Sequence, residues 1–493
     1  MKTLLVNPPW YCFQNRRENY IPLGIAYIAG ALTECGHEVR ILNGEQVLAP
    51  STIDENSKPD AAFFHATEKY LKYHDLSLPI WKIMGDEISK ESPDIVGVSM
   101  WSGSYQSAIN TCKVIKALDS NIVTVVGGIH PTLDPYSVIK HPEIDFVVCG
   151  EGERAAVELW QLLEKGGDIE EKAIGINGVW TKANGHIHEG GKTELIEEID
   201  DIPFPKYEAL IGDPSAAIAG IMTARGCPFG CTFCASKAIW GRKVRFRSVD
   251  SCIEELSHHR EKFGLKWFRV NDDSFCLRKE RVLEFCNKLV DRFGHTWWFA
   301  IDANVGNLDQ EIIDKLEWAG CTGISIGIES VVPRIQKLCR KSINLDRARE
   351  IISYINKSKI DCGVYFMTGF PHETEEELEK NIKFMKETKP KNSMWSIVTP
   401  YPGTELHRYS VEQGILPEVD PIHLIHHSAK TSMADIPLGR YEEILRRILR
   451  IREKIARKYR RRHTWFGLRP LVSRLVSPVR TFKRLIEKLN DLR

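Results

Sequence analysis

Two parts of the chain alternate short apolar runs with amphipathic segments. In roughly the first 165 residues, segments 23–35 and 105–118 have helical periodicity and separate runs rich in Val, Ile and Leu. These runs are TLLVN (3–7), EVRIL (38–42), DIVGVSM (94–100), NIVTVVGG (121–128) and DFVVCG (145–150). Continuous apolar runs bounded by Gly, Asp, Asn or Pro are typical of buried parallel strands. The order predicts an open, doubly wound α/β sheet with its ligand site beyond the strand carboxyl ends.

A second alternation begins near residue 219, and each strand candidate but the last is followed by a helical stretch. The candidates are AGIMTA (219–224), KWFRVN (266–271), WWFAID (297–302), TGISIGIES (322–330), CGVYFMTGF (362–370) and NSMWSIVTP (392–400). Right-handed βα repeats of this kind curl into a barrel or part of one, with functional residues at the strand carboxyl ends. We therefore expect a partial (β/α)6, TIM-like barrel.

These patterns predict five segments. They are a doubly wound, flavodoxin- or Rossmann-like domain (1–165), a connector (166–218), the partial barrel (219–400), an extension of the barrel (401–440) and a basic, amphipathic helical tail (441–493). A polar, partly helical stretch at 49–92 interrupts the first domain. The connector contains a short strand near GVWTK and the proline-rich IDDIPFPKYEAL.

Composition predicts the cellular compartment and shows that charge is unevenly distributed along the chain. The 493 residues are 43% hydrophobic and 27% charged, as in globular proteins, and no signal-peptide core or membrane-spanning run is visible, so we expect a cytoplasmic protein. Thirteen cysteines, an odd number, indicate free thiols and metal ligands rather than a disulfide framework. The net charge of +1 conceals the tail, where 17 Lys and Arg stand against 5 Asp and Glu.

The stretch RGCPFGCTFCAS (225–236) places Cys227, Cys231 and Cys234 in a C-x3-C-x2-C array directly after the first barrel strand. One interpretation is a zinc site completed by Cys252 or Cys276, although zinc normally takes two paired knuckles. The other is a [4Fe–4S] cluster, in which three thiolates leave one iron open to an outside ligand. The position at a strand carboxyl end favours the cluster.

This array, with the aromatic Phe233 before the last cysteine, resembles the signature of the radical S-adenosylmethionine (radical SAM) superfamily. The resemblance implies that the open iron chelates S-adenosylmethionine (SAM) and that the reduced cluster cleaves it to a 5′-deoxyadenosyl radical. It also implies a flavodoxin- or ferredoxin-type electron donor.

Further family positions follow along the barrel. In NDDSF, Asn271, Asp272 and Asp273 stand where relatives carry a Gly-Gly-Glu-like segment that receives the methionine ammonium group, although the glycines are missing here. Glu329, in GIES, occupies a position near the ribose and methionine, or is simply a solvated acid at a helix start. The segment from Gly363 through Gly369 to Thr374 resembles the part that packs on adenine, and Thr374 is also a candidate helix N-cap.

The N-terminal domain resembles that of the cobalamin (B12)-binding radical SAM proteins, through LLVNPPW, IPLGIAYIAGALTECGHEVRIL, PDIVGVSMWS, VVGGIHPTLDP and IDFVVCGEGE. The candidate corrinoid contacts are Ser99, Trp101, Gly127, Gly128, Gly150 and Glu151. Many corrinoid proteins carry Asp-x-His-x-x-Gly after the second strand, but here residues 43–46 read NGEQ, without the histidine. The resemblance implies cobalamin without that lower ligand, or a domain that kept its fold and lost the cofactor.

Two histidines and the basic tail also have interpretations that need no cofactor. His130 and His141 each lie beside proline, and we expect solvent-facing loop histidines rather than metal ligands. The tail is either a helix docked on the barrel with a solvated basic face or a segment that contacts anionic lipid. RNA binding ranks last, because no RNA-binding module accompanies the charge.

Together the patterns favour a radical SAM enzyme that methylates an unactivated carbon of a small or lipid-like substrate with the help of methylcobalamin. The alternatives are radical cyclisation or oxidative rearrangement without methyl transfer, and a non-catalytic iron–sulfur or corrinoid sensor. The sequence names no catalytic residue and no substrate.

Overall fold

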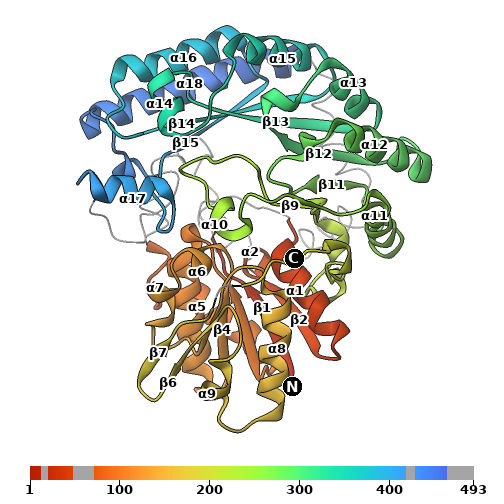
Figure 1. The fold of residues 1–493 in the computed structure, drawn as a ribbon, viewed down its shortest axis with the longest axis vertical. Coiled ribbons are helices and arrows are strands. Elements are labelled where there is room, and N and C mark those ends of the chain that lie inside the picture. Colours follow the sequence, from red (N-terminus) through yellow and green to blue (C-terminus); the bar gives the residue numbers. More distant parts are fainter. Residues whose placement is uncertain (11, 13–19, 48–71, 192, 418–427, 463–493) are drawn as a thin grey trace, which may run out of the picture.

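The computed structural model describes residues 1–10, 12, 20–47, 72–191, 193–417 and 428–462. Two α/β units are stacked on each other, with the short helix α10 (Ser236–Trp240) between them (Figure 1). The carboxyl ends of the N-terminal strands point toward the second unit (Figure 1). This arrangement places the predicted ligand edge of the first sheet against the predicted functional edge of the second.

The first unit contains a seven-stranded sheet of order β2-β1-β3-β4-β5-β6-β7. The five predicted strands are present and parallel: β1 (Lys2–Asn7), β2 (Glu38–Asn43), β3 (Ile95–Ser99), β4 (Val123–Gly127) and β5 (Phe146–Val148). Two antiparallel strands from the predicted connector, β6 (Val179–Ala183) and β7 (His186–His188), extend this sheet. The alternation of buried and half-buried residues in β6 suits an antiparallel strand with one face toward solvent.

Helices cover both faces of this sheet, as a doubly wound fold requires. Helices α1 (Leu23–Glu34) and α8 (Gly152–Lys165) pack together on one face, and α4 (Pro79–Glu91) packs with α5 (Tyr105–Leu118) on the other. Shorter helices complete the unit: α2 (Gly44–Val47), α6 (Ile129–Leu133), α7 (Pro135–Ile139) and α9 (Ile169–Ala173).

The second unit is a parallel six-stranded sheet of order β15-β14-β13-β12-β11-β8, which confirms the predicted partial barrel. Its strands are β8 (Ala219–Ile221), β11 (Trp267–Val270), β12 (Trp298–Ala303), β13 (Cys321–Glu329), β14 (Asp361–Thr368) and β15 (Asn392–Ile397). The first predicted strand is interrupted: its last residues form β9 (Ala224–Arg225), which pairs antiparallel with β10 (Arg245–Phe246).

Helices cover the outer face of the barrel sheet (Figure 1). They are α11 (Val249–Phe263), α12 (Lys279–Phe293), α13 (Gln310–Trp318), α14 (Pro333–Leu338), α15 (Leu345–Lys357) and α16 (Glu375–Thr388), whereas α17 (Glu405–Glu412) lies on the side of the N-terminal unit. Strand residues that face these helices, such as Phe268, Ile326 and Trp395, are buried in one continuous core. Their sequence neighbours face the concave inner side and are only half buried.

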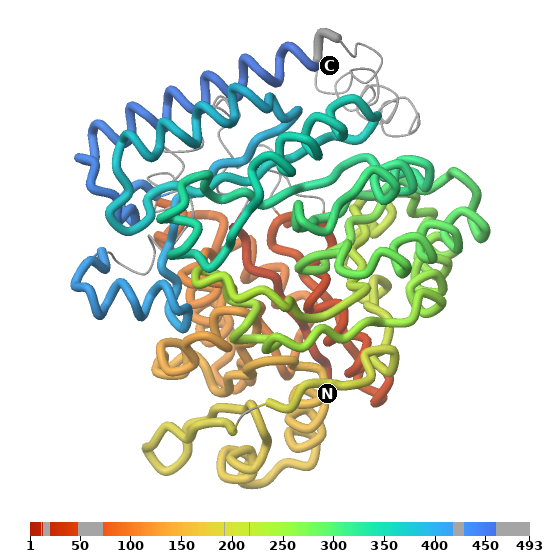
Figure 2. Tube along the Cα trace, turned by 45° about the horizontal axis from the view of Figure 1, so that its top comes forward, coloured from red at the N-terminus to blue at the C-terminus, as the bar shows by residue number. Residues whose placement is uncertain are grey.

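The basic segment begins as helix α18 (Leu438–Arg462), which runs alongside α16 (Figures 1 and 2). Ile444, Leu445 and Ile448 are buried against the barrel, and Arg440 binds Glu375 at 2.5 Å. The docked-helix interpretation therefore describes residues 438–462. The rest of the tail, 463–493, lies outside the described residues. No helix in the described ranges is long and apolar enough to cross a bilayer.

Helix α16 begins at the N-cap expected at Thr374, which the structure shows to be part of a capping box with Glu377. The Thr374 hydroxyl accepts from the Glu377 amide at 3.3 Å, and the Glu377 carboxylate accepts from the Thr374 amide at 3.1 Å. We expect Thr374→Ala to lower the unfolding free energy by about 1 kcal/mol, and Thr374→Ser to restore most of it. Chemical denaturation measures both values; an unchanged midpoint in the alanine variant would contradict this role.

The solvent-facing interpretation of His130 is wrong. Its ring is 3% exposed and lies between the Ser102 hydroxyl at 3.0 Å and the Ser137 hydroxyl at 3.2 Å. His141 is half buried and contacts the Tyr105 hydroxyl at 2.8 Å. Helices α5, α6 and α7 close over these rings, which makes them packing residues beneath the ligand edge of the sheet.

Burial lowers the pKa of His130 from 6.5 to about 4. The unfolded chain gains a proton near pH 6.5, whereas the folded chain does not until about pH 4, so stability falls as the pH drops through this window. We expect His130 to remove about 2 kcal/mol of unfolding free energy between pH 7 and pH 5. Chemical denaturation at both pH values should show a smaller loss of unfolding free energy in His130→Asn than in the wild type. Equal losses in the two proteins would refute the assignment.

Candidate functional site

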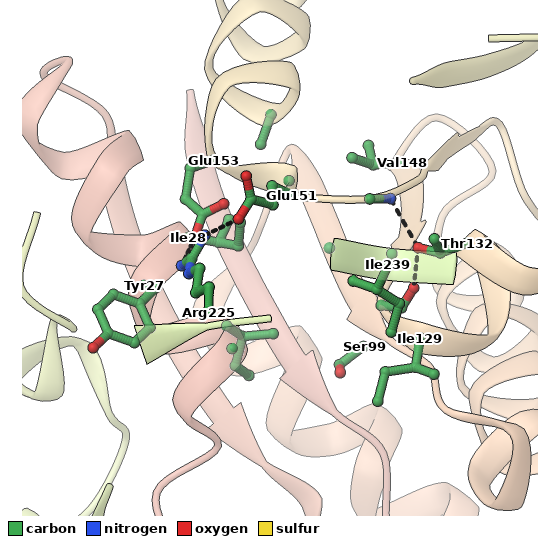
Figure 3. Close-up of a pocket in the computed structure, with 18 of the residues that line it drawn as sticks. Tyr27, Ile28, Ser99, Ile129, Thr132, Val148, Glu151, Glu153, Arg225 and Ile239 are labelled. Carbon is green, nitrogen blue, oxygen red and sulfur yellow. Dashed lines mark hydrogen bonds and ion pairs between the residues drawn. The ribbon is translucent and has the colours of Figure 1, made fainter. Parts of the chain in front are cut away.

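A cavity of about 490 Å³ lies between the two units (Figure 3). Its N-terminal wall includes predicted corrinoid contacts: Ser99 at the end of β3, Gly127 and Gly128 at the end of β4, and Gly150 and Glu151 after β5. Its barrel wall includes Cys234, Asn271 and Asp273. One cavity therefore gathers candidates for a corrinoid site and for a cluster and SAM site.

The three cysteines of the array lie on the loop between β9 and α10. Cys227 and Cys231 are half buried and Cys234 is exposed toward the cavity. The Cys234 amide donates to the Cys231 carbonyl at 3.2 Å, and the Ser236 amide donates to the Cys234 sulfur at 3.4 Å. Partial burial raises the pKa of all three thiols, so thiolates form here when a metal displaces their protons.

The donor set fits a polynuclear cluster better than a single zinc ion. Cys252 and Cys276, which could complete a zinc site, are buried in the barrel core on α11 and on the turn Phe275–Leu277. Within the described ranges, no three His, Cys, Asp or Glu side chains converge closely enough to hold one ion. A [4Fe–4S] cluster instead takes one thiolate at each of three irons.

An ion pair stands beside the cysteines. Lys341 binds Glu329 at 2.7 Å, and its positive charge acts on the Cys231 thiol. Glu329 ends β13 with a left-handed backbone (φ 59°), and a side chain at Gly327 would place its Cβ 2.5 Å from the Glu329 carboxylate. A strained acid held by a buried lysine at a strand end is an arrangement that functional sites retain.

The consecutive acids after β11 separate into two roles. The Asp273 carboxylate lines the cavity and accepts from the Ser236 hydroxyl at 2.7 Å. Asp272 faces the other way and is fully engaged, accepting from the Thr223 amide at 2.6 Å, its hydroxyl at 2.5 Å and the Ala224 amide at 3.1 Å. Burial raises the pKa of Asp272 to about 6. The structure therefore brings Asn271 and Asp273 to the cavity, but not Asp272.

Five other predicted contacts lie outside the cavity lining: Glu329, described above, and Trp101, Phe233, Gly363 and Gly369. Trp101 packs edge-on against Trp10, with ring centroids 4.4 Å apart. Phe233 packs on an apolar cluster that includes Val332 and Phe370. Gly363 lies near the start of β14, where an added Cβ would meet the Ser325 hydroxyl at 3.1 Å.

Gly369 follows the end of β14 with φ 85°, and its amide donates to the buried Glu373 at 2.6 Å. An added Cβ would come within 2.9 Å of the Tyr441 hydroxyl, so the glycine allows α18 to approach. Its role in the described structure is therefore to let the end of β14 approach the C-terminal helix α18.

Sequence reasoning missed an ion cluster that joins the units. Arg225, from β9, binds both Glu153 and Glu151, the latter at 3.0 Å (Figure 3). Arg245, from β10, binds the other Glu151 oxygen at 2.8 Å, and the Ile196 amide donates to the same carboxylate at 2.6 Å. The four charged side chains are at most 9% exposed. Glu151 therefore ties the N-terminal strand edge to the strand that leads into the cysteine loop.

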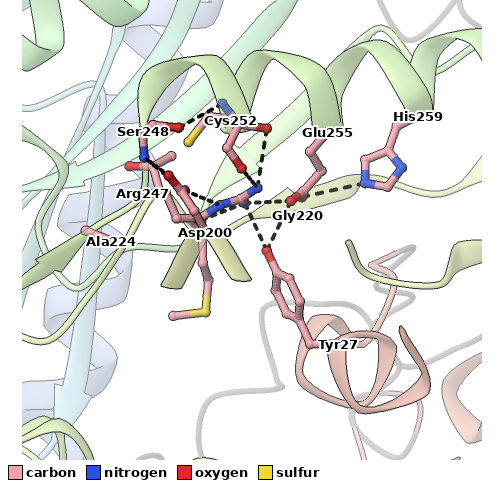
Figure 4. A network of polar contacts seen from close by, with 12 residues as sticks. Tyr27, Asp200, Gly220, Ala224, Arg247, Ser248, Cys252, Glu255 and His259 are labelled. Carbon is pink, nitrogen blue, oxygen red and sulfur yellow. Dashed lines mark hydrogen bonds and ion pairs between the residues drawn. The ribbon is translucent and has the colours of Figure 1, made fainter. Parts of the chain in front are cut away.

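A second network crosses the same boundary (Figure 4). Arg247 binds Glu255 of α11 at 2.6 Å, and Tyr27 of α1 donates to the same carboxylate at 3.4 Å. His259 stacks on Tyr207 with centroids 4.1 Å apart and lies 3.6 Å from Glu255. Arg245 and Arg247 stand two residues apart in the sequence. Two arginines at this spacing require acidic partners when they are buried, so their spacing could have indicated these two ion-pair networks.

The N-terminal wall fits a flat ligand with little side-chain contact. Gly24, Gly97, Gly127, Gly128, Gly150 and Gly152 all line the cavity. No histidine is among the described lining residues. The segment that lacks the expected histidine serves the fold instead: Glu45 accepts from the Trp10 and Cys12 amides, each at 2.8 Å. The described part of this wall therefore offers backbone and small side chains to a flat ligand, and no imidazole to the lower face of a corrinoid.

Comparison with known proteins agrees with this geometry. The radical SAM superfamily model matches residues 221–385, and the B12 binding domain model matches residues 61–160. An uncharacterized methyltransferase of Pyrococcus horikoshii is 32% identical over 87% of this chain and 88% of its own length. The cytidylyl-2-hydroxyethylphosphonate methyltransferase of Streptomyces wedmorensis is 27% identical over 85% of this chain and 83% of its own.

Among solved structures, the fold is similar to the radical SAM methyltransferase TsrM from Kitasatospora setae with cobalamin and a [4Fe–4S] cluster bound. The TM-score is 0.63 at 16% identity, over 85% of this chain and 76% of that one. The matched families carry a [4Fe–4S] cluster, SAM and cobalamin as cofactors. The chain belongs to the radical SAM superfamily, in the cobalamin-dependent group that includes these methyltransferases.

Proposed function

We propose that this protein methylates an unactivated carbon of a small molecule. One observation carries the proposal: a single cavity is lined by Cys234 of the barrel and by glycines at the carboxyl ends of the N-terminal strands. When bound, the cofactors supply radical and methyl-transfer chemistry, in which one SAM is cleaved reductively and a second donates its methyl group. Two electrons from a donor balance the reaction, whose products are the methylated substrate, 5′-deoxyadenosine, methionine and S-adenosylhomocysteine.

We assign Cys227, Cys231 and Cys234 as ligands of three irons, which leaves the fourth iron for SAM. Asn271 and Asp273 then offer oxygens to the methionine ammonium group, and their place on the cavity wall supports this role. Glu329, which Lys341 binds at 2.7 Å, stays a predicted contact near the ribose and methionine of SAM.

On the opposite wall, Ser99, Gly127, Gly128 and Gly150 contact the corrinoid in this proposal. In this proposal the N-terminal domain, predicted as residues 1–165, holds the corrinoid, and the barrel, predicted as residues 219–400, holds the cluster. Because β6 and β7 extend the first sheet, we propose that the N-terminal domain ends near residue 190 rather than at residue 165.

The electron donor in this proposal is a flavodoxin- or ferredoxin-type protein, because reductive SAM cleavage requires a strong one-electron reductant. Contact with a membrane surface is a prediction for residues 463–493, outside the described residues. Within α18, the apolar face needed for lipid contact is already covered by the barrel.

Anaerobic reconstitution tests the proposal. The chain is loaded with iron, sulfide and hydroxocobalamin, desalted, and its retained cobalt and iron are measured by absorption and mass spectrometry. We expect about one cobalt and four irons per chain. Four irons without cobalt would overturn the methyl-transfer proposal and favour a radical rearrangement or oxidation.

A further inference from the structure

The inner face of the barrel sheet carries charged and polar side chains to which the proposed function assigns no role. On β11 to β15, side chains that point outward are apolar and buried, whereas those that point inward are half buried. Arg269 and Asp302, which point inward from β11 and β12, retain 25% and 29% of their side-chain exposure. Paired strands flank both residues, so this exposure is toward the space enclosed by the sheet.

Arg269 and Asp302 form an ion pair with two polar neighbours. Tyr365 of β14 and Ser325 of β13 lie within hydrogen-bonding reach of this pair. In the sheet register, Asp302 lies beside Ser325, and Tyr365 lies beside Gly327. Four adjacent strands therefore contribute to one polar cluster on the inner face.

This cluster is incomplete within the protein. Oδ2 of Asp302 takes the ion pair, whereas Oδ1 is buried and forms no hydrogen bond of good geometry among the described residues, although the Ser325 hydroxyl lies near enough to lower the pKa of the carboxyl. Burial raises the pKa of Asp302 even though Arg269 acts to lower it. Arg269 donates one N–H to Asp302, and its guanidinium has five donors in a fixed planar fork. The cluster thus leaves Oδ1 of Asp302 without a well-aligned donor, and Arg269 has donors beyond those that meet Asp302 and Tyr365.

The cluster lies next to the proposed reaction site. Arg269 precedes Asn271 by two residues and points to the same side of the chain, about 7 Å deeper along the strand. Asn271 itself lines the cavity that contains Cys234 and Asp273. A molecule held by Arg269 therefore has its remaining atoms directed toward the cysteine loop.

We propose that the inner face holds the methyl acceptor through Arg269 and Asp302, and that the acceptor is a small hydrophilic molecule rather than a lipid. It carries an anionic group, such as a carboxylate or phosphonate, for Arg269 and a neighbouring amine or hydroxyl for Asp302. A lipid chain in this position would leave a buried carboxylate oxygen and a guanidinium without partners. This inference rests on the proposed methyl transfer.

Labelled methyl transfer tests the class of acceptor. The reconstituted holoenzyme is incubated with reductant, trideuteromethyl-SAM, and water-soluble and lipid extracts of cells that naturally express the protein. Mass spectrometry then finds products that carry the deuterated methyl group. We expect the labelled product in water and, at alkaline pH, bound to an anion-exchange resin. A labelled product in chloroform, or a labelled product without an anionic group, would overturn the inference.

Variants place the acceptor on these residues. We expect Arg269→Gln and Asp302→Asn each to lower labelled product at least about tenfold. Equilibrium dialysis of the purified product should show a similar loss of affinity. Arg349→Gln, an exposed arginine on outer helix α15, is the matched control and should leave both values unchanged. Iron, cobalt and thermal midpoint establish that each variant is loaded and folded. Unchanged product and affinity in both inner-face variants would refute the site.

A different outcome would separate this inference from the proposed function. If the wild type forms 5′-deoxyadenosine but labels no molecule, methyl transfer is wrong. The extracts are then fractionated, and the anionic aqueous fraction must raise 5′-deoxyadenosine formation in the wild type and not in Arg269→Gln for the inference to stand. Stimulation by the lipid fraction, or by no fraction, would overturn it.

Discussion

Replacing Cys231 with alanine is expected to abolish both the cluster and the cleavage of SAM. Only three thiols of the array are available to hold the irons, so the loss of one leaves two irons without a protein ligand. We expect iron after anaerobic reconstitution to fall from about four per chain to below about one, and 5′-deoxyadenosine to fall to the detection limit. Iron analysis, absorption spectra and chromatography of the reaction mixture measure these losses.

Two other cysteines provide controls. Cys35 is exposed after helix α1, remote from the array in the sequence and on the other unit. Cys339 is a closer comparison, because its carbonyl accepts from the Thr232 amide at 3.2 Å while its own thiol is buried in an apolar cluster. Cys35→Ala and Cys339→Ala should keep about four irons per chain. Full turnover by Cys231→Ala, or loss of iron in Cys339→Ala, would contradict the ligand assignment.

The sheets could be predicted because their signals are local. Runs such as DIVGVSM and NIVTVVGG bury both faces of a parallel strand, which demands continuous apolar sequence. The array of cysteines was equally local, since three ligands within eight residues define their own loop. The capping box at Thr374 required only a four-residue pattern.

The predicted contacts that lie outside the cavity lining depend on side-chain direction or on distant partners. Asn271 and Asp273 line the cavity whereas Asp272 binds Thr223 and Ala224, and the sequence alone did not say which of these side chains faced the cavity. Trp101 packs against Trp10, a residue nearly a hundred positions earlier, instead of lining the cavity. His130 became buried because three helices, set by tertiary packing, closed over it.

The ion cluster between the units could not be predicted from the sequence, because its partners are also distant along the chain. Glu151 and Arg225 are 74 residues apart, and each alone resembles an ordinary surface charge. Glu151 was proposed as a corrinoid contact because it follows a strand, and it does line the cavity. Its carboxylate, however, is already shared by Arg225, Arg245 and the Ile196 amide. We therefore interpret it as a positioning residue between the two cofactor walls.

This interpretation predicts a large effect for Glu151→Gln. Hydrogen bonds from Arg245 and Ile196 and the charge of Arg225 lower the pKa of Glu151 against the effect of burial, so the residue is anionic in the folded protein. The neutral amide would leave two arginine charges beneath the cavity with only Glu153 to balance them, and Nε and Nη2 of Arg245 already have no hydrogen-bond partner in the described structure.

We expect the variant to lose about 3 kcal/mol of unfolding free energy, at the low end for breaking a buried ion pair because the amide retains part of the hydrogen bonding. Cobalamin retention should fall with it, since Glu151 anchors the loop that forms one cavity wall. Denaturation of the full chain and cobalt analysis measure the two effects, and Glu158→Gln, exposed on the same helix α8, is the control. If Glu151→Gln kept wild-type stability and cobalt, the ion cluster would not position the two cofactor walls. Their alignment would then have to come from the apolar packing of α1 and α8 against the barrel.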